Sequence, residues 1–280
     1  MVELSDNAEI VMKSRYALHE KETWDELSRR VALGTAEIEK DSKYVKLFEE
    51  IISEMLFIPA GRILRNIGRP KGNLLNCFGM VVGDSISEIA KWKGDSLILW
   101  SDGGGVGVNI SQLRPEGAPI TGKGGSSSGP VSFLTASNAD AETIKTGGSR
   151  RAAGLALMLI THPDVLKFID AKSNSNKLNN YNISVGITEE FLDAVESNKD
   201  WTFRFAQKNY QTMPAREIWN KICENMMSFA EPGLINWDNL RENNSYYYSP
   251  VEICNPCQPK YATVLKKTGL STIENTKIGD

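Results

Sequence analysis

Short runs of alternating apolar residues, separated by helical patterns, constrain most strongly what this chain can fold into. The runs occupy residues 106–110, 183–187 and 201–205, and each has the period of two that is typical of a β-strand. Apolar residues at helical spacing follow in residues 218–230. Strands that alternate with helices favour an α/β fold.

The first 70 residues have a different pattern. From Lys43 to Phe57 the apolar positions recur at helical spacing. Thr23 and Glu26 have the spacing of a capping box, which marks the start of a helix. We therefore expect a helical domain over residues 1–70, ahead of the α/β part.

The composition excludes several functional classes. The 280 residues carry a net charge of -3, so the basic balance typical of nucleic-acid binding is absent. No apolar run approaches the ~20 residues that span a bilayer, and the first residues do not form a signal peptide, so no membrane partner is expected. Four cysteines do not indicate a disulfide scaffold, and we expect a cytoplasmic protein. His19 and His162 are far apart in sequence, which argues against a His/Cys zinc site.

Glycine-rich segments are the candidate ligand-binding loops. Residues 102–109 place glycines before an apolar strand, where the backbone either approaches a phosphate or simply turns into the core. Residues 122–130 form a polar loop that either wraps a phosphate chain or lies in solvent. Residues 146–151 end in two arginines, whose forked donors suit a phosphate or a base, although a surface charge pair is the simpler interpretation.

The cysteines and the second histidine also have ordinary explanations. Cys77 lies between apolar neighbours and Cys223 lies in a helical pattern, where a buried core thiol is the common outcome. His162-Pro163-Asp164 has the pattern of a helix start with proline at the first helical position. Residues 241–249 are polar and predict a loop that leads to a strand around Cys254.

Taken in order, these segments resemble the large catalytic chain of the ribonucleotide reductases. The resemblance runs from about Leu4 to Cys257 and is most like the adenosylcobalamin-dependent class. No ATP-cone regulatory domain is evident ahead of residue 4. The motifs that carry the resemblance are Phe57-Ile58-Pro59-Ala60-Gly61-Arg62-Ile63-Leu64, Asn76-Cys77-Phe78, Gly104-Gly105-Val106-Gly107, Leu113-Arg114-Pro115-Glu116-Gly117-Ala118-Pro119, Ser128-Gly129-Pro130-Val131-Ser132-Phe133, Gly147-Gly148-Ser149-Arg150-Arg151, His162-Pro163-Asp164, Glu231-Pro232-Gly233 and Asn255-Pro256-Cys257.

The resemblance implies a ten-stranded α/β barrel built of two half-barrels, of which residues 71–256 would be the first. It implies that adenosylcobalamin generates a thiyl radical, that the radical abstracts the 3′-hydrogen of a ribonucleotide, and that a cysteine pair then reduces the 2′ position. It also implies dNTP and ATP effectors, a thioredoxin-type reductant and a homodimer formed through helices beside the effector site. The missing C-terminal half of the reductase would be a further partner.

The same resemblance gives roles to particular residues. Cys77 is implied to be a redox-active thiol, Asn255 a catalytic residue and Cys257 the thiyl position. The residues implied to bind the substrate are Asn76, Cys77, Ser111 and Asn255, with Ser111 near the diphosphate. The residues implied to bind the effector are Asp84, Ser85, Ile86, Thr121, Lys123, Gly147, Gly148, Ser149, Arg150 and Arg151.

The chain after Cys257 departs from the reductase pattern. A Gly-Glu pair should follow, but Gln258 and Pro259 stand there. Residues 257–280 instead resemble the N-terminal splicing block of an intein, a self-splicing insert whose first cysteine attacks the preceding carbonyl. Residues 262–265 and 271–273 predict two short strands, so that this tail would be a β-rich fragment. Cys257 would then be the intein nucleophile, and the chain alone would be inactive.

Two alternatives remain open. The chain is either an uninterrupted reductase with a divergent tail, or a non-catalytic module that binds deoxynucleotides through the effector loops. The sequence does not reveal whether a ribonucleoside diphosphate or triphosphate would be reduced.

Overall fold

The computed structural model describes residues 2–39, 41–122, 124–144, 152–173, 178–245 and 248–253. The chain divides into two compact units, one that ends at Asn76 and one that begins at Cys77. Each unit has a hydrophobic core of its own. The tail from residue 254 onward, including the two strands predicted there, lies outside the described residues.

The first unit is helical, as predicted. Thr23 and Glu26 form the expected capping box, because each side chain accepts a hydrogen bond from the other residue's backbone N–H. The third helix ends four residues before Phe57, since Met55 has a φ of 56° that a helix does not allow. The helices are α1 (Asp6–Arg15), α2 (Trp24–Ala36), α3 (Ser42–Ser53) and α4 (Gly61–Asn66), with a 3-10 turn at Glu37–Glu39.

A buried ion pair joins the elements of the first unit. Arg30 of α2 donates from Nε to one carboxylate oxygen of Glu22 at 2.7 Å and from Nη2 to the other at 3.1 Å. The two side chains are only 11% and 4% exposed. Arg30 also donates to the carbonyl oxygens of Leu64 and Ile67 at the end of α4. One guanidinium group therefore links α2 to the turn before it and to α4.

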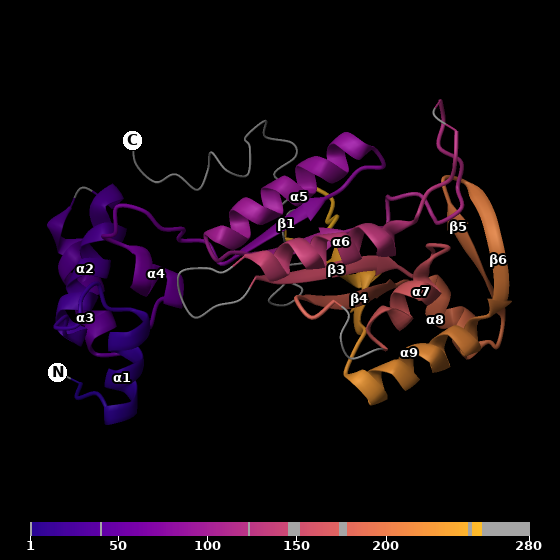
Figure 1. Ribbon diagram of the computed structural model, residues 1–280. Coiled ribbons are helices and arrows are strands. Elements are labelled where there is room, and N and C mark those ends of the chain that lie inside the picture. Colours follow the sequence, from indigo (N-terminus) through magenta and orange to yellow (C-terminus); the bar gives the residue numbers. More distant parts are fainter. Residues whose placement is uncertain are drawn as a thin grey trace. The chain divides into compact units, whose positions relative to one another are not determined.

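The second unit contains a five-stranded, wholly parallel sheet with the strand order β1-β2-β3-β4-β7 (Figure 1). The strands are β1 (Cys77–Val81), β2 (Gly105–Asn109), β3 (Ala153–Leu159), β4 (Tyr181–Ile187) and β7 (Gly233–Asn236). The helices are α5 (Ile86–Ser101), α6 (Pro130–Thr143), α7 (Val165–Ile169), α8 (Glu189–Glu196), α9 (Ala215–Phe229) and α10 (Trp237–Glu242), with a 3-10 turn at Asp170–Lys172. This confirms the predicted α/β class, and five parallel strands are consistent with half of a ten-stranded barrel.

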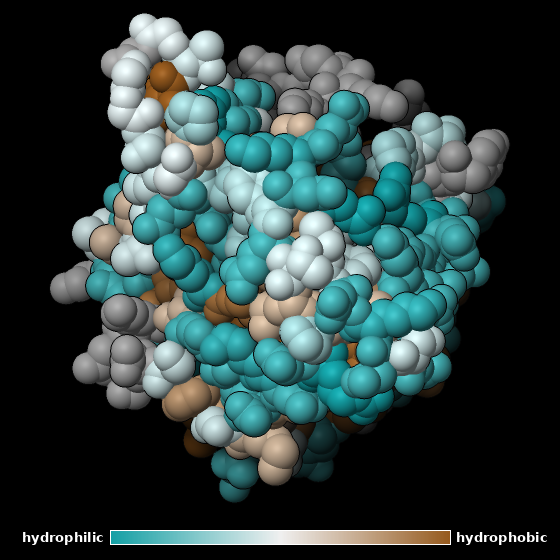
Figure 2. Space-filling view, turned by 90° about the vertical axis from the view of Figure 1, so that its right-hand side faces the viewer, coloured by the Kyte–Doolittle hydropathy of each residue, from teal (hydrophilic) through white to brown (hydrophobic). Residues whose placement is uncertain are grey.

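A separate hairpin of two antiparallel strands, β5 (Asp200–Phe205) and β6 (Lys208–Pro214), lies outside this sheet. Trp201 and Phe203 of β5 are buried, whereas β6 is largely exposed. The side of the molecule that carries the hairpin is mainly hydrophilic, with small hydrophobic patches (Figure 2). Within the described ranges, no helix is long and apolar enough to cross a bilayer.

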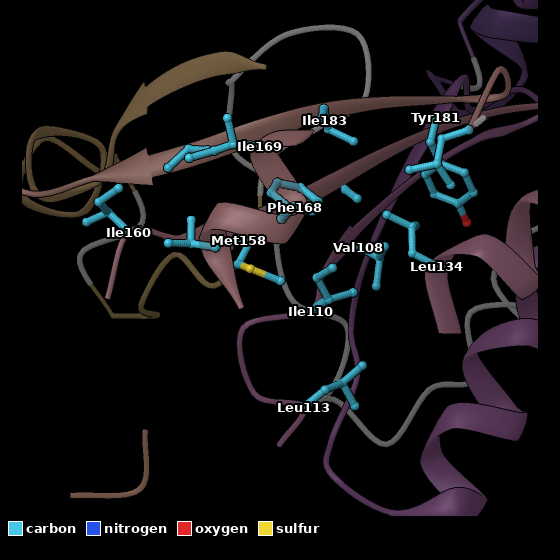
Figure 3. Close-up of a cluster of buried hydrophobic side chains, with 14 of the residues drawn as sticks. Val108, Ile110, Leu113, Leu134, Met158, Ile160, Phe168, Ile169, Tyr181 and Ile183 are labelled. Atoms are coloured by element: carbon cyan, nitrogen blue, oxygen red, sulfur yellow. The ribbon is translucent and has the colours of Figure 1, made fainter. Parts of the chain in front are cut away.

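The two faces of the parallel sheet differ sharply in side-chain size. Neighbouring residues across parallel strands share a face, so the register decides which side chains lie together. One face carries large apolar residues such as Val108, Met158 and Ile183, which pack with Leu134 of α6 and Phe168 of α7 (Figure 3). We call the opposite face the glycine-rich face; it carries Cys77, Gly79, Val81, Gly105, Gly107, Asn109, Leu155, Leu157, Leu159, Ser184, Gly186, Gly233 and Ile235.

The three predicted strands are confirmed as β2, β4 and β5, and the predicted helix over 218–230 as α9. The glycines before β2 form a tight turn into the core. Glycine is needed at position 104, because a Cβ there would lie 2.8 Å from the Phe78 ring. Two local predictions are wrong. Pro163 precedes the helix start instead of occupying its first position, because α7 begins at Val165 after Asp164. The loop expected from Arg241 begins later, because α10 continues to Glu242.

Candidate functional site

The glycine-rich face is the candidate site, and a later part of the chain lies against it. Residues 251–253 cross this face, where Ile253 is completely buried in a cluster with Leu155, Leu157 and Ile235. Open parallel sheets bind their ligands beyond the carboxyl ends of the strands. The chain therefore brings residues 251–253, which directly precede the predicted site residues Asn255 and Cys257, onto the sheet that carries Cys77.

Asn109, at the carboxyl end of β2, holds the crossing segment. Its Nδ2 donates to the carbonyl oxygen of Glu252 at 2.7 Å, and its Oδ1 accepts from the Ser111 N–H at 3.0 Å. The Asn109 side chain is nearly inaccessible to solvent, which strengthens both bonds. Sequence reasoning missed Asn109, although a polar residue at the end of an apolar strand is a recognisable signal.

Ser111 joins the ends of two neighbouring strands. Its Oγ accepts a hydrogen bond from the Leu159 N–H at the end of β3, at 2.8 Å. The side chain is half-buried. Ser111 thus lies at the carboxyl ends of β2 and β3, the edge at which parallel sheets place ligand groups.

Cys77 lies on the same face but at the opposite end of the sheet. It is the first residue of β1, is half-buried, and its sulfur is in a disulfide. Val81, four residues later, pairs with Asn109, so Cys77 and Asn109 are separated by roughly 13 Å along the strands. The structure therefore places Cys77 and Ser111 on one sheet but does not bring them together. Asn76 directly precedes β1 and is half-buried.

Asp84, Ser85 and Ile86 form the start of α5. Ser85 caps this helix by accepting from the Glu88 N–H at 3.2 Å. Asp84 accepts from Nε and from the backbone N–H of Arg114, at 2.7 and 3.0 Å. Ile86 is exposed and able to pack against a ligand.

Arg114 connects this segment to a second candidate loop. Its Nη1 donates to the carbonyl oxygen of Pro119 at 3.0 Å. Residues 117–127 fold back on themselves through hydrogen bonds between Gly117 and Ser127 and between Ile120 and Gly125, which leaves Thr121 exposed near the tip. The structure thus links Asp84 through Arg114 to the loop that carries Thr121, and Ser85 and Ile86 directly follow Asp84 at the start of α5. The remaining predicted site residues, Lys123, Gly147, Gly148, Ser149, Arg150, Arg151, Asn255 and Cys257, lie outside the described residues.

His162 does not serve as a metal ligand. Its Nδ1 accepts from the Asp164 N–H at 3.0 Å, so Nε2 carries the proton and donates to the Leu113 carbonyl oxygen at 2.8 Å. Burial lowers the pKa of His162, although the Leu113 carbonyl and the Asp164 carboxylate act in the opposite direction. In the part of the chain that the structure describes, no group of His, Cys, Asp and Glu residues could hold a metal ion. Those residues also identify no contact for the corrin of adenosylcobalamin, and we derive no step through that cofactor.

Two family models match nearly the whole chain. The model "Ribonucleotide reductase, all-alpha domain" matches residues 2–72, and "Ribonucleotide reductase, barrel domain" matches residues 75–262. The chain belongs to the ribonucleotide reductase family. The family is one of oxidoreductases, and the two matched regions correspond to the helical unit and to the unit with the parallel sheet.

The curated relatives point to the same class as the sequence. The chain is 35% identical over 238 residues to a "Vitamin B12-dependent ribonucleoside-diphosphate reductase" of Thermoplasma acidophilum, covering 84% of this chain and 31% of the relative. It is 34% identical over 273 residues to the Mycobacterium tuberculosis reductase of the same name, covering 91% of this chain and 39% of the relative. A "Ribonucleoside-diphosphate reductase subunit alpha" of Chlamydia muridarum is 28% identical over 178 residues, covering 62% of this chain and 17% of the relative. The chain thus spans 31% of the length of the Thermoplasma relative and 39% of the length of the Mycobacterium relative.

Proposed function

We propose that this chain is the N-terminal part of an adenosylcobalamin-dependent reductase that converts ribonucleotides to 2′-deoxyribonucleotides for DNA synthesis. One observation carries the proposal. Residues 251–253, which lead to Asn255-Pro256-Cys257, cross the face of the parallel sheet that bears Cys77. The vitamin B12 dependence of the named relatives supports the choice of class.

The proposed chemistry is a two-electron reduction at the ribose. A cysteine at the position of Cys257 would hold the thiyl radical that abstracts the 3′-hydrogen, and adenosylcobalamin, when bound, would supply the radical chemistry. Cys77 and a second thiol would then supply two electrons and two protons, the 2′-hydroxyl would leave as water, and the two sulfurs would end as a disulfide. Asn255 and Asn76 would bind the substrate, and Ser111 would lie near its diphosphate.

The proposed effector site comprises Asp84, Ser85, Ile86 and the loop with Thr121 and Lys123, together with residues 147–151. The Arg114 guanidinium supports this site. It bonds to Asp84 and to the Pro119 carbonyl oxygen, and so joins residues 84–86 to the loop. A dNTP or ATP effector bound there would act on both residues 84–86 and the loop with Thr121 and Lys123. A homodimer through helices beside this site is consistent with the exposed Ile86 and Ile98 on α5.

We also propose that residues 257–280 begin an intein. Gln258 and Pro259 replace the Gly-Glu pair of the reductases, and the family match ends at residue 262, so that residues 263–280 fall outside it. In this proposal the Cys257 thiol attacks the Pro256 carbonyl, and excision joins Pro256 to a cysteine supplied by the downstream reductase segment. The proposed domains are therefore 1–70, 71–256 and 257–280. The chain would reduce no ribonucleotide without its C-terminal half.

In the test, the reductase gene is expressed together with its downstream segment. Intein excision and ribonucleotide reduction are both measured. We expect mass spectrometry to find a joined Asn-Pro-Cys-Gly-Glu product, a Cys257→Ala variant to block excision, and Cys77→Ser to abolish ribonucleotide reduction after normal excision. Cys223, a free thiol on α9, provides the matched control, and Cys223→Ser should leave both activities intact. An uninterrupted protein in which Cys257 is retained would refute the intein. Full reduction by Cys77→Ser would refute the role of Cys77.

A binding module without catalysis is the second candidate, because the described effector elements 84–86, 117–122 and 124–127 all belong to this chain. Equilibrium titration of the chain with dTTP decides between the binding module and the reductase. Tight binding without the C-terminal half would favour the module, and binding only in the completed protein would favour the reductase.

A further inference from the structure

The turn after β3 holds one short segment at both of its ends. His162 Nε2 donates to the carbonyl oxygen of Leu113 at 2.8 Å. Asp164 Oδ2 accepts from the backbone N–H of Glu116, also at 2.8 Å. The two side chains are only 2% and 8% exposed. Residues 113–116 are therefore fixed from their first residue to their last by a turn about 50 positions later in the chain.

The turn itself is rigid. The Asp164 N–H donates to His162 Nδ1 at 3.0 Å, which selects the tautomer that can donate to Leu113. The Phe205 ring packs edge-on against the imidazole, with 5.5 Å between ring centroids and an interplanar angle of 74°. The Val165 N–H closes the turn on the His162 carbonyl at 3.1 Å. Each side chain is thus held in its bonding position before it meets residues 113–116.

The Asp164 carboxylate also lies where the two ends of the loop 117–128 meet. Glu116 precedes this loop and Gly129 follows it. A Cβ on Gly129 would lie 2.7 Å from Asp164 Oδ2 and 3.0 Å from both Cβ and N of Glu116. Lys167 of α7 forms an ion pair with the Glu116 side chain, which adds a second link between the same two segments. One buried carboxylate therefore defines the base of the loop.

The clamped segment contains the residue that faces the proposed effector site. Arg114 lies between the two clamped positions and bonds to Asp84 and to the Pro119 carbonyl. On its other side, the turn continues β3, whose last residue Leu159 is bonded to Ser111. A continuous series of hydrogen bonds thus runs from the start of α5, through the loop base, to the carboxyl ends of β2 and β3.

We propose that His162 and Asp164 are positioning residues for the effector response: they fix the base of the loop 117–128, so that a change at residues 84–86 reaches the sheet. Neither residue touches substrate or effector in this proposal. The inference rests on the effector role proposed above for this loop. It adds two residues and a contiguous route of bonded groups through which coupling can travel, and the experiment below tests the coupling itself.

A merely structural clamp would behave differently from a positioning one. If the clamp only stabilised the fold, its loss would lower the fraction of folded protein but leave effector selectivity unchanged in the molecules that fold. If it positions the loop, effector response falls in protein that is still folded. The two cases are separated by measuring loop opening and effector response on the same variants.

The experiment uses Asp164→Ala, which removes the acceptor, and Asp164→Asn, which keeps one oxygen for the Glu116 N–H. Amide hydrogen exchange on the full chain should show residues 116–129 exchanging at least about tenfold faster in Asp164→Ala, because a hydrogen bond to a charged group is lost, and near the wild-type rate in Asp164→Asn. Asp238→Asn is the matched control, since Asp238 also accepts from a backbone N–H, that of Glu189, but away from the loop. If Asp164→Ala fails to fold, His162→Gln tests the other end of the clamp.

The second arm places the same substitutions in the completed reductase and measures reduction with and without dTTP. We expect stimulation by dTTP to fall about tenfold in Asp164→Ala and to recover in Asp164→Asn, with the unstimulated rate unchanged. Unchanged exchange of residues 116–129 overturns the clamp, and faster exchange with full dTTP stimulation overturns its positioning role. If the wild-type reductase shows no dTTP response at all, the proposed effector site fails, while the exchange arm still decides whether the clamp exists.

Discussion

Substituting Glu22 by glutamine should destabilise the helical unit far more than a typical surface substitution. The amide keeps the size of the side chain but leaves the buried Arg30 guanidinium without its counter-charge. Breaking a buried ion pair by removing one partner costs about 3–5 kcal/mol. Arg30 keeps its bonds to the Leu64 and Ile67 carbonyl oxygens, so we expect the lower end, about 3 kcal/mol, or a more than hundredfold rise in the opened population.

The destabilisation caused by Glu22→Gln should be larger at neutral pH than in acid. Burial acts to raise the pKa of Glu22, but the hydrogen bond from Arg30, the Leu18 N–H and the charge of Arg30 together lower it below its ordinary value. Because the pKa of Glu22 is lowered by folding, the ionised Glu22 stabilises the folded protein above the unfolded-state pKa of about 4.3. This stabilisation is lost as the pH falls through the lower pKa of the folded state. The difference between wild type and Glu22→Gln should therefore be greatest at neutral pH and shrink in acid below about pH 4.

Native-state hydrogen exchange of the α2 amides is the appropriate assay, because it reports on the helical unit alone. Glu9→Gln is the matched control, since the Glu9–Lys13 pair is exposed and should contribute less than about 1 kcal/mol. The double variant Glu22→Leu with Arg30→Met should recover only part of the lost stability, because it also removes the bonds to the Leu18 N–H and to the Leu64 and Ile67 carbonyl oxygens. Equal effects of Glu22→Gln and Glu9→Gln, or an effect of the same size at pH 3 and pH 7, would refute the reasoning.

Three further predictions follow from the second unit. Gly154→Ala should destabilise it by about 1–3 kcal/mol in urea unfolding, because the new Cβ would lie 2.4 Å from the buried Tyr181 ring; a neutral result would contradict the tight packing. Asn109→Leu should make the amides of residues 251–253 exchange about tenfold faster, and unchanged exchange would mean that Asn109 does not hold them. Arg114→Met should weaken dTTP binding to the completed reductase about tenfold, with little change in the unfolding midpoint because its ion pair is partly exposed; undiminished affinity would remove Arg114 from the effector route.

Local patterns predicted much of the fold, and their failures have physical causes. The alternation in residues 106–110 and 183–187 predicted β2 and β4, because apolar side chains on one face of a strand recur every second residue. The run at β3 is apolar throughout, since both faces of this strand are buried, and such a run does not distinguish a strand from a buried helix. The short β7 begins with a glycine and has too few residues to show a period.

The candidate site was predicted less completely than the fold. The resemblance singled out Cys77 within the motif Asn76-Cys77-Phe78, and Ser111 and Asp84 by their places between the motifs. The bond from Asn109 to the Glu252 carbonyl joins residues 143 positions apart, which no local pattern can predict. His162 was assigned to a helix start by its proline neighbour, whereas tertiary bonds to Leu113 determine its position.

The contrast between the two faces of the parallel sheet has a consequence for a mutational scan of this chain. On the face covered by α5 to α9, a change in side-chain volume disturbs packing, so the affected variants should be lost from the folded pool. On the glycine-rich face, an added methyl group would take up room near residues 251–253 and, under the function proposed above, near the nucleotide. A substitution at Gly79, Gly105 or Gly107 should therefore lower nucleotide binding more than abundance. Substitutions at Gly186 or Gly233 should lower both, because an added Cβ would lie 2.7 Å from the Leu159 side chain or 2.9 Å from Ser184 Oγ. A scan that scores abundance and nucleotide binding separately should therefore recover the orientation of each strand without any coordinates.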